Sequence, residues 1–161
     1  MFIYNMAYEI ERKFLVNDTS FVEEASHSYH LKQGYLSLDK DRTVRVRIMN
    51  DKAFITIKGA STEDGLTRFE WEKEIDVDDA NNLLKLALPG LIVKTRYFVP
   101  QGDYTWEVDI FEGENRGLIM AEVELEGETD EVKKPPFIGE EVTGDKRYYN
   151  TYLMQHPYLN W

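Results

Sequence analysis

The chain contains no cysteine, and this absence removes several kinds of chemistry at once. Disulfide bonds, thiolate zinc sites and cysteine nucleophiles all need the thiol group. A protein without disulfides suits a reducing compartment, so the composition predicts a cytoplasmic protein. Histidine is scarce too, because only His27, His30 and His156 occur, and none of them lies within a recognisable motif. Covalent histidine chemistry is therefore not expected.

Long apolar runs are also missing from the sequence. No segment approaches the roughly 20 consecutive apolar residues that a membrane-spanning helix needs. The first ten residues, MFIYNMAYEI, lack both the basic start and the long apolar stretch of a secretory signal. Residues 1–5 are interpreted as a short extension, with Met6 as an alternative start. We expect no membrane partner.

Basic residues are outnumbered by acidic ones, with 19 Lys and Arg against 30 Asp and Glu and a formal net charge of -11. An acidic chain of this kind does not offer the broad basic surface that binds nucleic acid or anionic membranes. Hydrophobic residues make up 42% of the 161 residues, which is enough for a buried core in one domain. We predict a single domain over residues 1–161, with a core at about 7–155.

Eight segments alternate between polar and apolar residues and are rich in strand-forming side chains. They are residues 8–16, 30–38, 42–50, 52–59, 66–77, 92–100, 104–111 and 118–126. Short turn-forming sequences at 50–52, 100–103 and 112–117 indicate antiparallel neighbours. The pattern predicts a mainly β (α+β) fold, an eight-stranded antiparallel β-barrel flanked by a few helices.

Helical signals are fewer. Residues 76–88 follow an N-capping aspartate, Asp76 or Asp78, and stop at Pro89-Gly90, which predicts a helix. A second helix is predicted over 143–155, ending before Pro157, and a short turn or helix at 19–27. Two consecutive prolines exclude a strand interior at 132–137, which is predicted to be a loop.

Charged residues follow one face of seven of the predicted strands. On a single strand, such a stripe indicates a solvated sheet face with cross-strand ion pairs. Seven stripes together, with acids and bases paired and few neutral residues, favour a barrel with a charged interior and an apolar exterior under helices and loops. Buried charges must be paired or hold a ligand. Cations would receive a polyanion, and carboxylates would hold a metal bridging to it.

The segment EIERKFL, residues 9–15, resembles the E-x-E-x-K signature of the CYTH domain superfamily, also called triphosphate tunnel metalloenzymes. Further pieces resemble the family in the same order: QGYLS (33–37), RVR (45–47), TIKG (56–59), RFEWEKEI (68–75), KTR (94–96), WEVDIF (106–111), GLIMAEVELE (117–126) and GEEVTGDKRYYN (139–150). The signature alone is unspecific, but the ordered set covers residues 7 to about 155. The resemblance implies an eight-stranded tunnel, a triphosphate substrate and a requirement for Mg²⁺ or Mn²⁺.

The resemblance also assigns roles to individual residues. Metal ligands would be Glu9, Glu11, Glu122 and Glu124, with Asp109 as a fifth. The phosphate-binding group would be Lys13, Arg45, Arg47, Lys58, Lys94, Arg96 and Lys146. By their position alone, Glu70 and Glu72 are expected to orient the attacking water, and Lys94 is also predicted to be catalytic; which carboxylate takes the proton is left open. The competing interpretation is that these acids and bases only pair with one another across strands.

Tyr35 is the residue that is hardest to assign from the sequence. It can contact the substrate or Lys94, or it can be a packed tyrosine of the barrel. We include it among the substrate-binding candidates because it lies in the QGYLS segment.

Inorganic triphosphate, hydrolysed to pyrophosphate and phosphate, is the substrate that the chain favours, because it carries no appended module and no obvious pocket for a base. The alternatives are an adenylate cyclase of the class IV type, a nucleoside or thiamine triphosphatase, a non-catalytic polyphosphate-binding module and a plain ion-paired barrel. The full set of acids favours an enzyme, since a binder could keep the bases and lose the metal pairs. A homodimer through the apolar outer wall remains an open alternative.

Overall fold

The computed structural model describes residues 6–161, so the predictions about an N-terminal extension at residues 1–5 lie outside the described residues. In chain order the elements are β1 (Met6–Val16), α1 (Phe21–Glu24), β2 (His27–Ser37), β3 (Thr43–Met49), β4 (Lys52–Ser61), β5 (Thr67–Ile75), α2 (Val77–Leu84), β6 (Ile92–Gln101), β7 (Tyr104–Phe111), η1 (Gly113–Asn115), β8 (Ile119–Glu124), β9 (Ile138–Glu141), η2 (Lys146–Tyr148), α3 (Asn150–Gln155) and η3 (Tyr158–Asn160). All eight predicted strands are present. The ninth, β9, was missed because four residues are too short to show an alternation.

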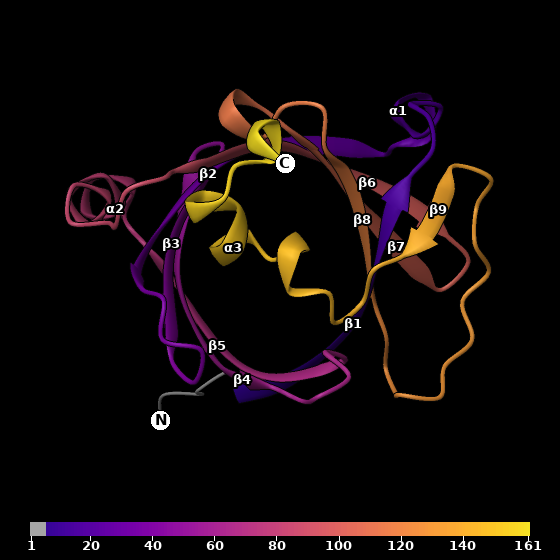
Figure 1. Cartoon of the computed structure of the whole chain (residues 1–161), viewed down its shortest axis with the longest axis horizontal. Coiled ribbons are helices and arrows are strands. Elements are labelled where there is room, and N and C mark those ends of the chain that lie inside the picture. The colour runs from indigo at the N-terminus through magenta and orange to yellow at the C-terminus, as the bar shows by residue number, and fades with distance from the viewer. Residues whose placement is uncertain (1–5) are drawn as a thin grey trace.

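The strands close into a barrel, which Figure 1 shows as a ring. The order is β5-β4-β3-β2-β6-β7-β8-β1, and an additional pairing of β5 with β1 joins the two ends. Strand β1 makes this closure because residues 6–10 pair with β5 and residues 11–15 pair with β8, both antiparallel. Strand β9 adds to the end of β1. The predicted eight-stranded antiparallel barrel is therefore confirmed.

Two hairpin turns show why consecutive strands can pair so closely. Asn50 has a positive φ of 54° and stands between β3 and β4, where Met49 pairs with Lys52. Gly102 has a φ of 58° in the β6–β7 turn, where Gln101 pairs with Tyr104. Asn and Gly tolerate this left-handed conformation, and two-residue turns that use it match the twist of the paired strands.

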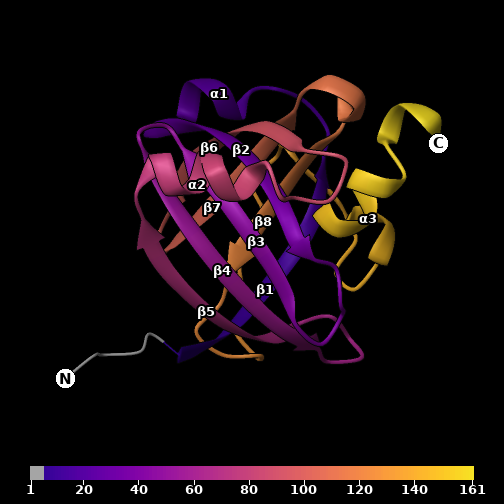
Figure 2. The ribbon, with the colours of Figure 1, turned by 90° about the vertical axis from the view of Figure 1, so that its left-hand side faces the viewer.

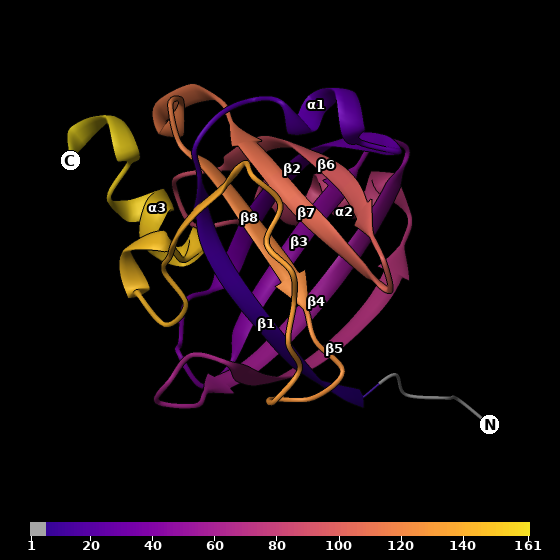
Figure 3. The same ribbon diagram turned by 90° about the vertical axis from the view of Figure 1, so that its right-hand side faces the viewer.

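Apolar side chains cover the outside of the barrel, as the sequence predicts. One outer core lies on the β1–β7–β8 wall, where Phe14 packs edge-to-face on Trp106 with ring centroids 5.4 Å apart. Helix α1 contributes Phe21 and the segment leading to β9 contributes Phe137. Figure 3 shows that segment crossing the outside of β8 and β1.

A second outer core lies on the opposite wall beneath α2 (Figure 2). Val46 of β3 and Ala53 of β4 pack against Ala80 of the helix, and all three are fully buried. Because the apolar side of each strand is used on the outside, the alternation of strand side chains directs the charged side inward.

A third apolar cluster fills one end of the barrel from within. Phe111, Met120 and Tyr35 extend from the strands and pack against Leu153 and Met154 of α3. Figure 1 shows α3 lying across the ring. The end of the interior that α3 covers therefore contains most of the apolar side chains, and the charged cavity occupies the remainder.

The helices are shorter than the sequence predicts. Helix α2 ends at Leu84, and the predicted 143–155 helix is wrong for its first half. There, η2 is followed by Tyr149 in an extended conformation, with φ -77° and ψ 140°, before α3 begins. The Tyr149 ring lies 4.9 Å from Lys13 Nζ, which places this break at the barrel interior. None of the helices in residues 6–161 has the length and hydrophobicity needed to cross a lipid bilayer.

Candidate active site

The inward side chains converge on one cavity of about 440 Å³. Seven glutamates and six basic residues line it, so the two signs of charge are nearly balanced. The charged lining residues are Glu9, Glu11, Lys13, Arg45, Arg47, Lys58, Arg68, Glu70, Glu72, Arg96, Glu107, Glu122 and Glu124. Each of the eight barrel strands contributes to the lining, which confirms the prediction of a charged interior.

Most of the predicted site residues meet here. Twelve of them line the cavity: Glu9, Glu11, Lys13, Tyr35, Arg45, Arg47, Lys58, Glu70, Glu72, Arg96, Glu122 and Glu124. Lys94, Asp109 and Lys146 do not line it. Of these three, Lys94 and Asp109 are buried behind the lining, whereas Lys146 is exposed in η2.

The glutamates of β1 and β8 form the acidic side of the cavity. Glu11 stands directly opposite Glu124 in the strand register. Burial raises the pKa of Glu11 well above its usual value, and the charges of Glu122 and Glu9 raise it further. The pKa of Glu124 is raised by burial and then by the charge of Glu9. These carboxylates therefore repel one another and lack enough positive charge nearby.

Glu122 is ionised in the same group. Burial would raise the pKa of Glu122, but the nearby charges of Lys13 and Arg96 lower it far below its usual value. The pKa values of Glu11 and Glu122 are thus pushed in opposite directions. A divalent cation beside Glu11 would favour its ionised form.

These residues fit a hard divalent cation by donor type, because Mg²⁺ and Mn²⁺ take carboxylate oxygens. The mutual repulsion around Glu11 supports the fit, since it is the repulsion that a bound cation relieves. Within residues 6–161, no three acidic or histidine side chains are gathered closely enough to ligate one ion. Glu9, Glu11, Glu122 and Glu124 would therefore have to draw together around it.

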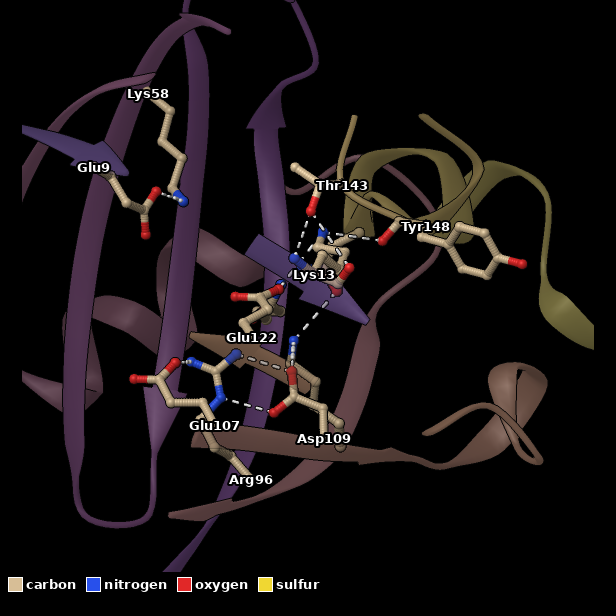
Figure 4. Close-up of polar contacts among 12 residues, drawn as sticks. Glu9, Lys13, Lys58, Arg96, Glu107, Asp109, Glu122, Thr143 and Tyr148 are labelled. Atoms are coloured by element: carbon tan, nitrogen blue, oxygen red, sulfur yellow. Dashed lines mark hydrogen bonds and ion pairs between the residues drawn. The ribbon is translucent and has the colours of Figure 1, made fainter. Parts of the chain in front are cut away.

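Lys58 lies close to two glutamates of the cavity. Its Nζ lies 2.9 Å from Glu9 Oε2 and 3.9 Å from Glu70 Oε2, and Figure 4 shows the first contact. Burial would raise the pKa of Glu9, but the Lys58 charge lowers it overall. The pKa of Glu70 is raised, first by burial and then by the Glu9 charge. Glu70 is thus the more basic of the two carboxylates.

Behind the cavity, Asp109 holds two cations at once (Figure 4). Arg96 donates to it through Nε and Nη2 at 2.7 and 2.8 Å, and Lys94 Nζ lies 2.7 Å away. Burial is the main cause that lowers the pKa of Lys94 to about 7, and the Arg96 charge adds to it. Both oxygens of Asp109 are therefore in contact with these two cations, and Asp109 does not line the cavity; its role as a metal ligand stays a prediction.

The segment that covers the barrel end contributes contacts of its own. Lys13 Nζ lies 3.5 Å from Glu122 and 3.3 Å from the main-chain oxygen of Tyr148 (Figure 4). Asn150 Oδ1 accepts from Lys94 Nζ at 3.3 Å. By contrast, Arg147 pairs with Asp145 on the exposed side at 2.7 Å, and its neighbour Lys146 is exposed. Neither Lys146, which was predicted to bind phosphate, nor Arg147 lines the cavity.

Two buried polar residues of the site were missed by sequence reasoning. Thr56 is fully buried, accepts from Arg45 Nη2 at 3.2 Å and donates to Glu72 Oε2 at 2.7 Å. Gln33 is fully buried as well and accepts from Arg47 Nε at 2.9 Å. Both lie on the inward side of their strands, which was the available signal, but neither carries charge.

Arg45 has a buried donor that faces a shortage of acceptors. It is buried, and its Nε has no hydrogen-bond partner within residues 6–161. Its nearest acid is Glu72, at 3.6 Å from Nη2. A buried donor without an acceptor costs free energy that an oxyanion in the cavity would restore.

A closed barrel with an apolar exterior, and with basic and acidic side chains facing one another inside, is the architecture expected of a tunnel enzyme for small phosphorylated anions. The chain belongs to the CYTH domain family, whose model matches residues 7–150.

Relatives support this assignment along nearly the whole chain. The inorganic triphosphatase of Acetivibrio thermocellus is 47% identical over 157 residues, covering 97% of this chain and 99% of the relative. The inorganic triphosphatase of Nitrosomonas europaea is 39% identical over 150 residues, covering 90% of this chain and 95% of the relative. The crystal structure of the inorganic triphosphatase NE1496 superposes with a TM-score of 0.65 at 34% identity, covering 91% of this chain and 97% of that one.

Proposed function

We propose that this protein hydrolyses inorganic triphosphate to pyrophosphate and phosphate within the tunnel, with Mg²⁺ or Mn²⁺ as the cofactor. The observation that carries the proposal is the cavity of about 440 Å³ in which bases and glutamates from seven of the eight barrel strands face one another. The full-length similarity to two inorganic triphosphatases supports the same substrate.

The basic residues bind the phosphate chain in this proposal. Lys13, Arg45, Arg47, Lys58 and Arg96 all line the cavity. Arginine can bind two phosphate oxygens at once, whereas lysine acts as a point charge. Lys94 lies behind this layer and acts indirectly, by holding Asp109 and Asn150 in place.

The carboxylates Glu9, Glu11, Glu122 and Glu124 would hold the divalent cation. When bound, the cation neutralises negative charge on the phosphate oxygens. Until then, Lys58 and Lys13 pair with Glu9 and Glu122. These pairs would have to open as substrate and cation enter, so the same lysines could then turn to the phosphates.

A water molecule attacks the terminal phosphorus in line with the bond that breaks. The new oxygen–phosphorus bond forms while the bridging oxygen leaves with pyrophosphate, and the water's proton passes to a carboxylate. Glu70 suits this role because its raised pKa makes it a better base than an ordinary glutamate. Glu72, which accepts from Thr56, is held in a fixed position where it can orient the water.

The test offers the purified protein inorganic triphosphate, ATP and thiamine triphosphate, each with Mg²⁺ or Mn²⁺. Phosphate, pyrophosphate and cyclic AMP are measured. We expect triphosphate turnover well above ATP turnover, with equal yields of phosphate and pyrophosphate. Cyclic AMP as the main product would contradict hydrolysis, and tight binding of triphosphate without turnover would favour a polyphosphate-binding module.

Three finer statements remain part of this proposal. The preferred cation is measured in the same assay by comparing the two metals. Whether the chain forms a homodimer through its apolar outer surface is tested by measuring its molar mass in solution. A cytoplasmic location, expected from the absence of cysteine, is measured by fractionation of cells that produce the protein.

A further inference from the structure

Arg47 has only uncharged neighbours on its two flanking strands. The register places Gln33 of β2 directly opposite it on one side and Phe54 of β4 on the other. Side chains opposite each other in a sheet lie on the same face and within contact distance. The side chains nearest to Arg47 in the barrel wall therefore supply no negative charge.

Most other bases of the cavity stand next to an acid. Lys58 is opposite Glu70, and Lys13 is opposite Glu122, with closest N–O distances of 3.9 and 3.5 Å. Arg47 forms no ion pair with any carboxylate of the described residues. Its charge is thus not neutralised by a carboxylate in direct contact with it.

Arg68 is the other lining base without an ion pair in the part of the chain that the structure describes. It donates through Nε to the main-chain oxygen of Gly59 at 2.6 Å and through Nη2 to Thr43 at 2.8 Å. Both ends of its guanidinium are therefore engaged by the protein. Arg47 differs, because within residues 6–161 only its Nε is engaged.

Gln33 engages that Nε from behind the cavity. Its side chain is fully buried and its Oε1 accepts from Arg47 Nε at 2.9 Å. Its Nε2 lies 3.4 Å from the Tyr35 hydroxyl, two residues along the same strand. A guanidinium can only donate, so the amide must turn its oxygen to Arg47 and its nitrogen to Tyr35. The two Nη groups of Arg47 are left to face the cavity that Arg47 lines.

We propose that Gln33 is a positioning residue that fixes the Arg47 guanidinium by one hydrogen bond while remaining neutral, so that the full positive charge is available to the phosphate chain. A glutamate would fit the same space and accept the same hydrogen bond, but it would neutralise Arg47. This inference rests on the proposed function only in naming the anion as triphosphate. Gln33 itself does not line the cavity and is not a catalytic residue.

The first test is Gln33→Glu, which changes charge with little change in shape. We expect KM for inorganic triphosphate to rise about tenfold, as for the loss of one charge-assisted contact, while kcat changes by less than about threefold. The melting temperature without ligand stays equal or rises, because the new carboxylate pairs with Arg47. An unchanged KM in a folded Gln33→Glu protein would overturn the proposal.

The second test is Gln33→Met, which keeps the volume and the neutrality but removes the hydrogen bond. We expect KM to rise because Arg47 is no longer held, and the melting temperature to fall because its Nε loses its acceptor. Wild-type KM in this variant would show that Gln33 only fills space. If Gln33→Glu failed to fold, the KM of Gln33→Met alone would test whether Gln33 positions Arg47.

Gln101→Glu is the matched control. Gln101 accepts from Trp106 Nε1 at 2.8 Å outside the cavity, so the same substitution adds the same charge at a distant hydrogen bond. We expect its KM to stay at the wild-type value. An equal rise in KM for both glutamate variants would assign the effect to net charge and would contradict positioning by Gln33.

Calorimetric binding of inorganic triphosphate without divalent cation separates this inference from the proposed function. If the wild-type protein binds triphosphate but does not hydrolyse it, the proposed function fails, and the comparison of Gln33 variants still holds for affinity. If the wild-type protein hydrolyses triphosphate and all three variants bind it equally well, the proposed function stands and the role of Gln33 is overturned.

Discussion

Arg96 and Asp109 lie directly opposite each other on β6 and β7, and two hydrogen bonds of 2.7 and 2.8 Å join the guanidinium to the carboxylate. The same carboxylate lies 2.7 Å from Lys94 Nζ. All three side chains are buried, so Asp109 supplies negative charge both to Arg96, which lines the cavity, and to Lys94, which lies behind it. Removing one partner of a buried ion pair destabilises a protein far more than the intact pair stabilises it.

Asp109→Asn should therefore act on stability. The two cations lose their compensating charge, and the free energy of unfolding should fall by about 3–5 kcal/mol. Denaturant unfolding measures this. Asp103→Asn, in the exposed turn of the same hairpin, is the control and should change stability by less than about 0.5 kcal/mol. If Asp109→Asn kept wild-type stability and instead weakened the response to Mg²⁺ or Mn²⁺, Asp109 would be a metal ligand after all.

Glu11→Gln should abolish most of the metal-dependent turnover without lowering the stability of the fold. Removing this carboxyl relieves the repulsion from Glu122 and Glu9 that raises its pKa, so the protein without metal should be at least as stable as wild type. Metal-dependent turnover should fall at least about a hundredfold, the size expected when a charge-stabilising group is lost. The rise in melting temperature on adding Mg²⁺ should disappear.

Glu23→Gln, on the exposed side of α1, is the control for that experiment and should leave both the turnover and the metal response unchanged. Near-normal turnover in Glu11→Gln would remove Glu11 from the metal-binding group. It would also weaken the interpretation of the β1 and β8 glutamates as a set.

Thr56→Val should impair the cavity without removing a charge. The hydroxyl accepts from Arg45 and donates to Glu72, so valine of nearly equal shape leaves both side chains without that support. We expect about 1–2 kcal/mol of lost stability and about a tenfold lower kcat/KM. Thr105→Val, at an exposed position of β7, is the control and should change neither. Wild-type kcat/KM in the Thr56 variant would show that Arg45 and Glu72 are held in place by other contacts.

The barrel and most of its site could be predicted because strand alternation encodes which side of each strand faces inward. Glu11, Arg45 and Glu124 are charged at alternating positions, and the closure of the sheet brings them to one cavity. The resemblance to the family supplied the substrate and the metal, which alternation alone does not.

What the sequence did not reveal depends on contacts between distant segments. From the sequence, Asp109 cannot be distinguished from other inward-facing acids. The strand register places Arg96 opposite it, and the folded structure adds the contact with Lys94. Gln33 and Thr56 are neutral, so a search for charged stripes passes over them. Strand β9 forms because Phe14 and Val16 of β1 offer an edge with which it pairs. A segment of four residues is too short to predict this pairing from the sequence.

The pairing of Arg12 with Glu141 ties β9 to β1 and gives a pH dependence whose sign can be worked out. Arg12 donates to both carboxylate oxygens at 2.9 and 2.7 Å, and Thr143 donates to the same group at 2.8 Å. The Arg12 hydrogen bond lowers the pKa of Glu141 below its usual value of 4.5. A lowered folded-state pKa means that the stabilisation is present above about pH 4.5 and is lost as the pH falls through the folded pKa.

Glu141→Gln should accordingly cost about 0.5 kcal/mol at pH 7, a small value because the pair is partly exposed. The difference from wild type should shrink as the pH falls below 4.5 and vanish once Glu141 is protonated in the folded protein. Denaturant unfolding over this pH range measures it, with Glu140→Gln, the exposed neighbour in β9, as the control that should show no difference at any pH. A cost that stayed constant down to the lowest pH would mean that Glu141 stabilises β9 through shape and neutral hydrogen bonds. The ion pair with Arg12 cannot give that result, because it is lost when Glu141 is protonated.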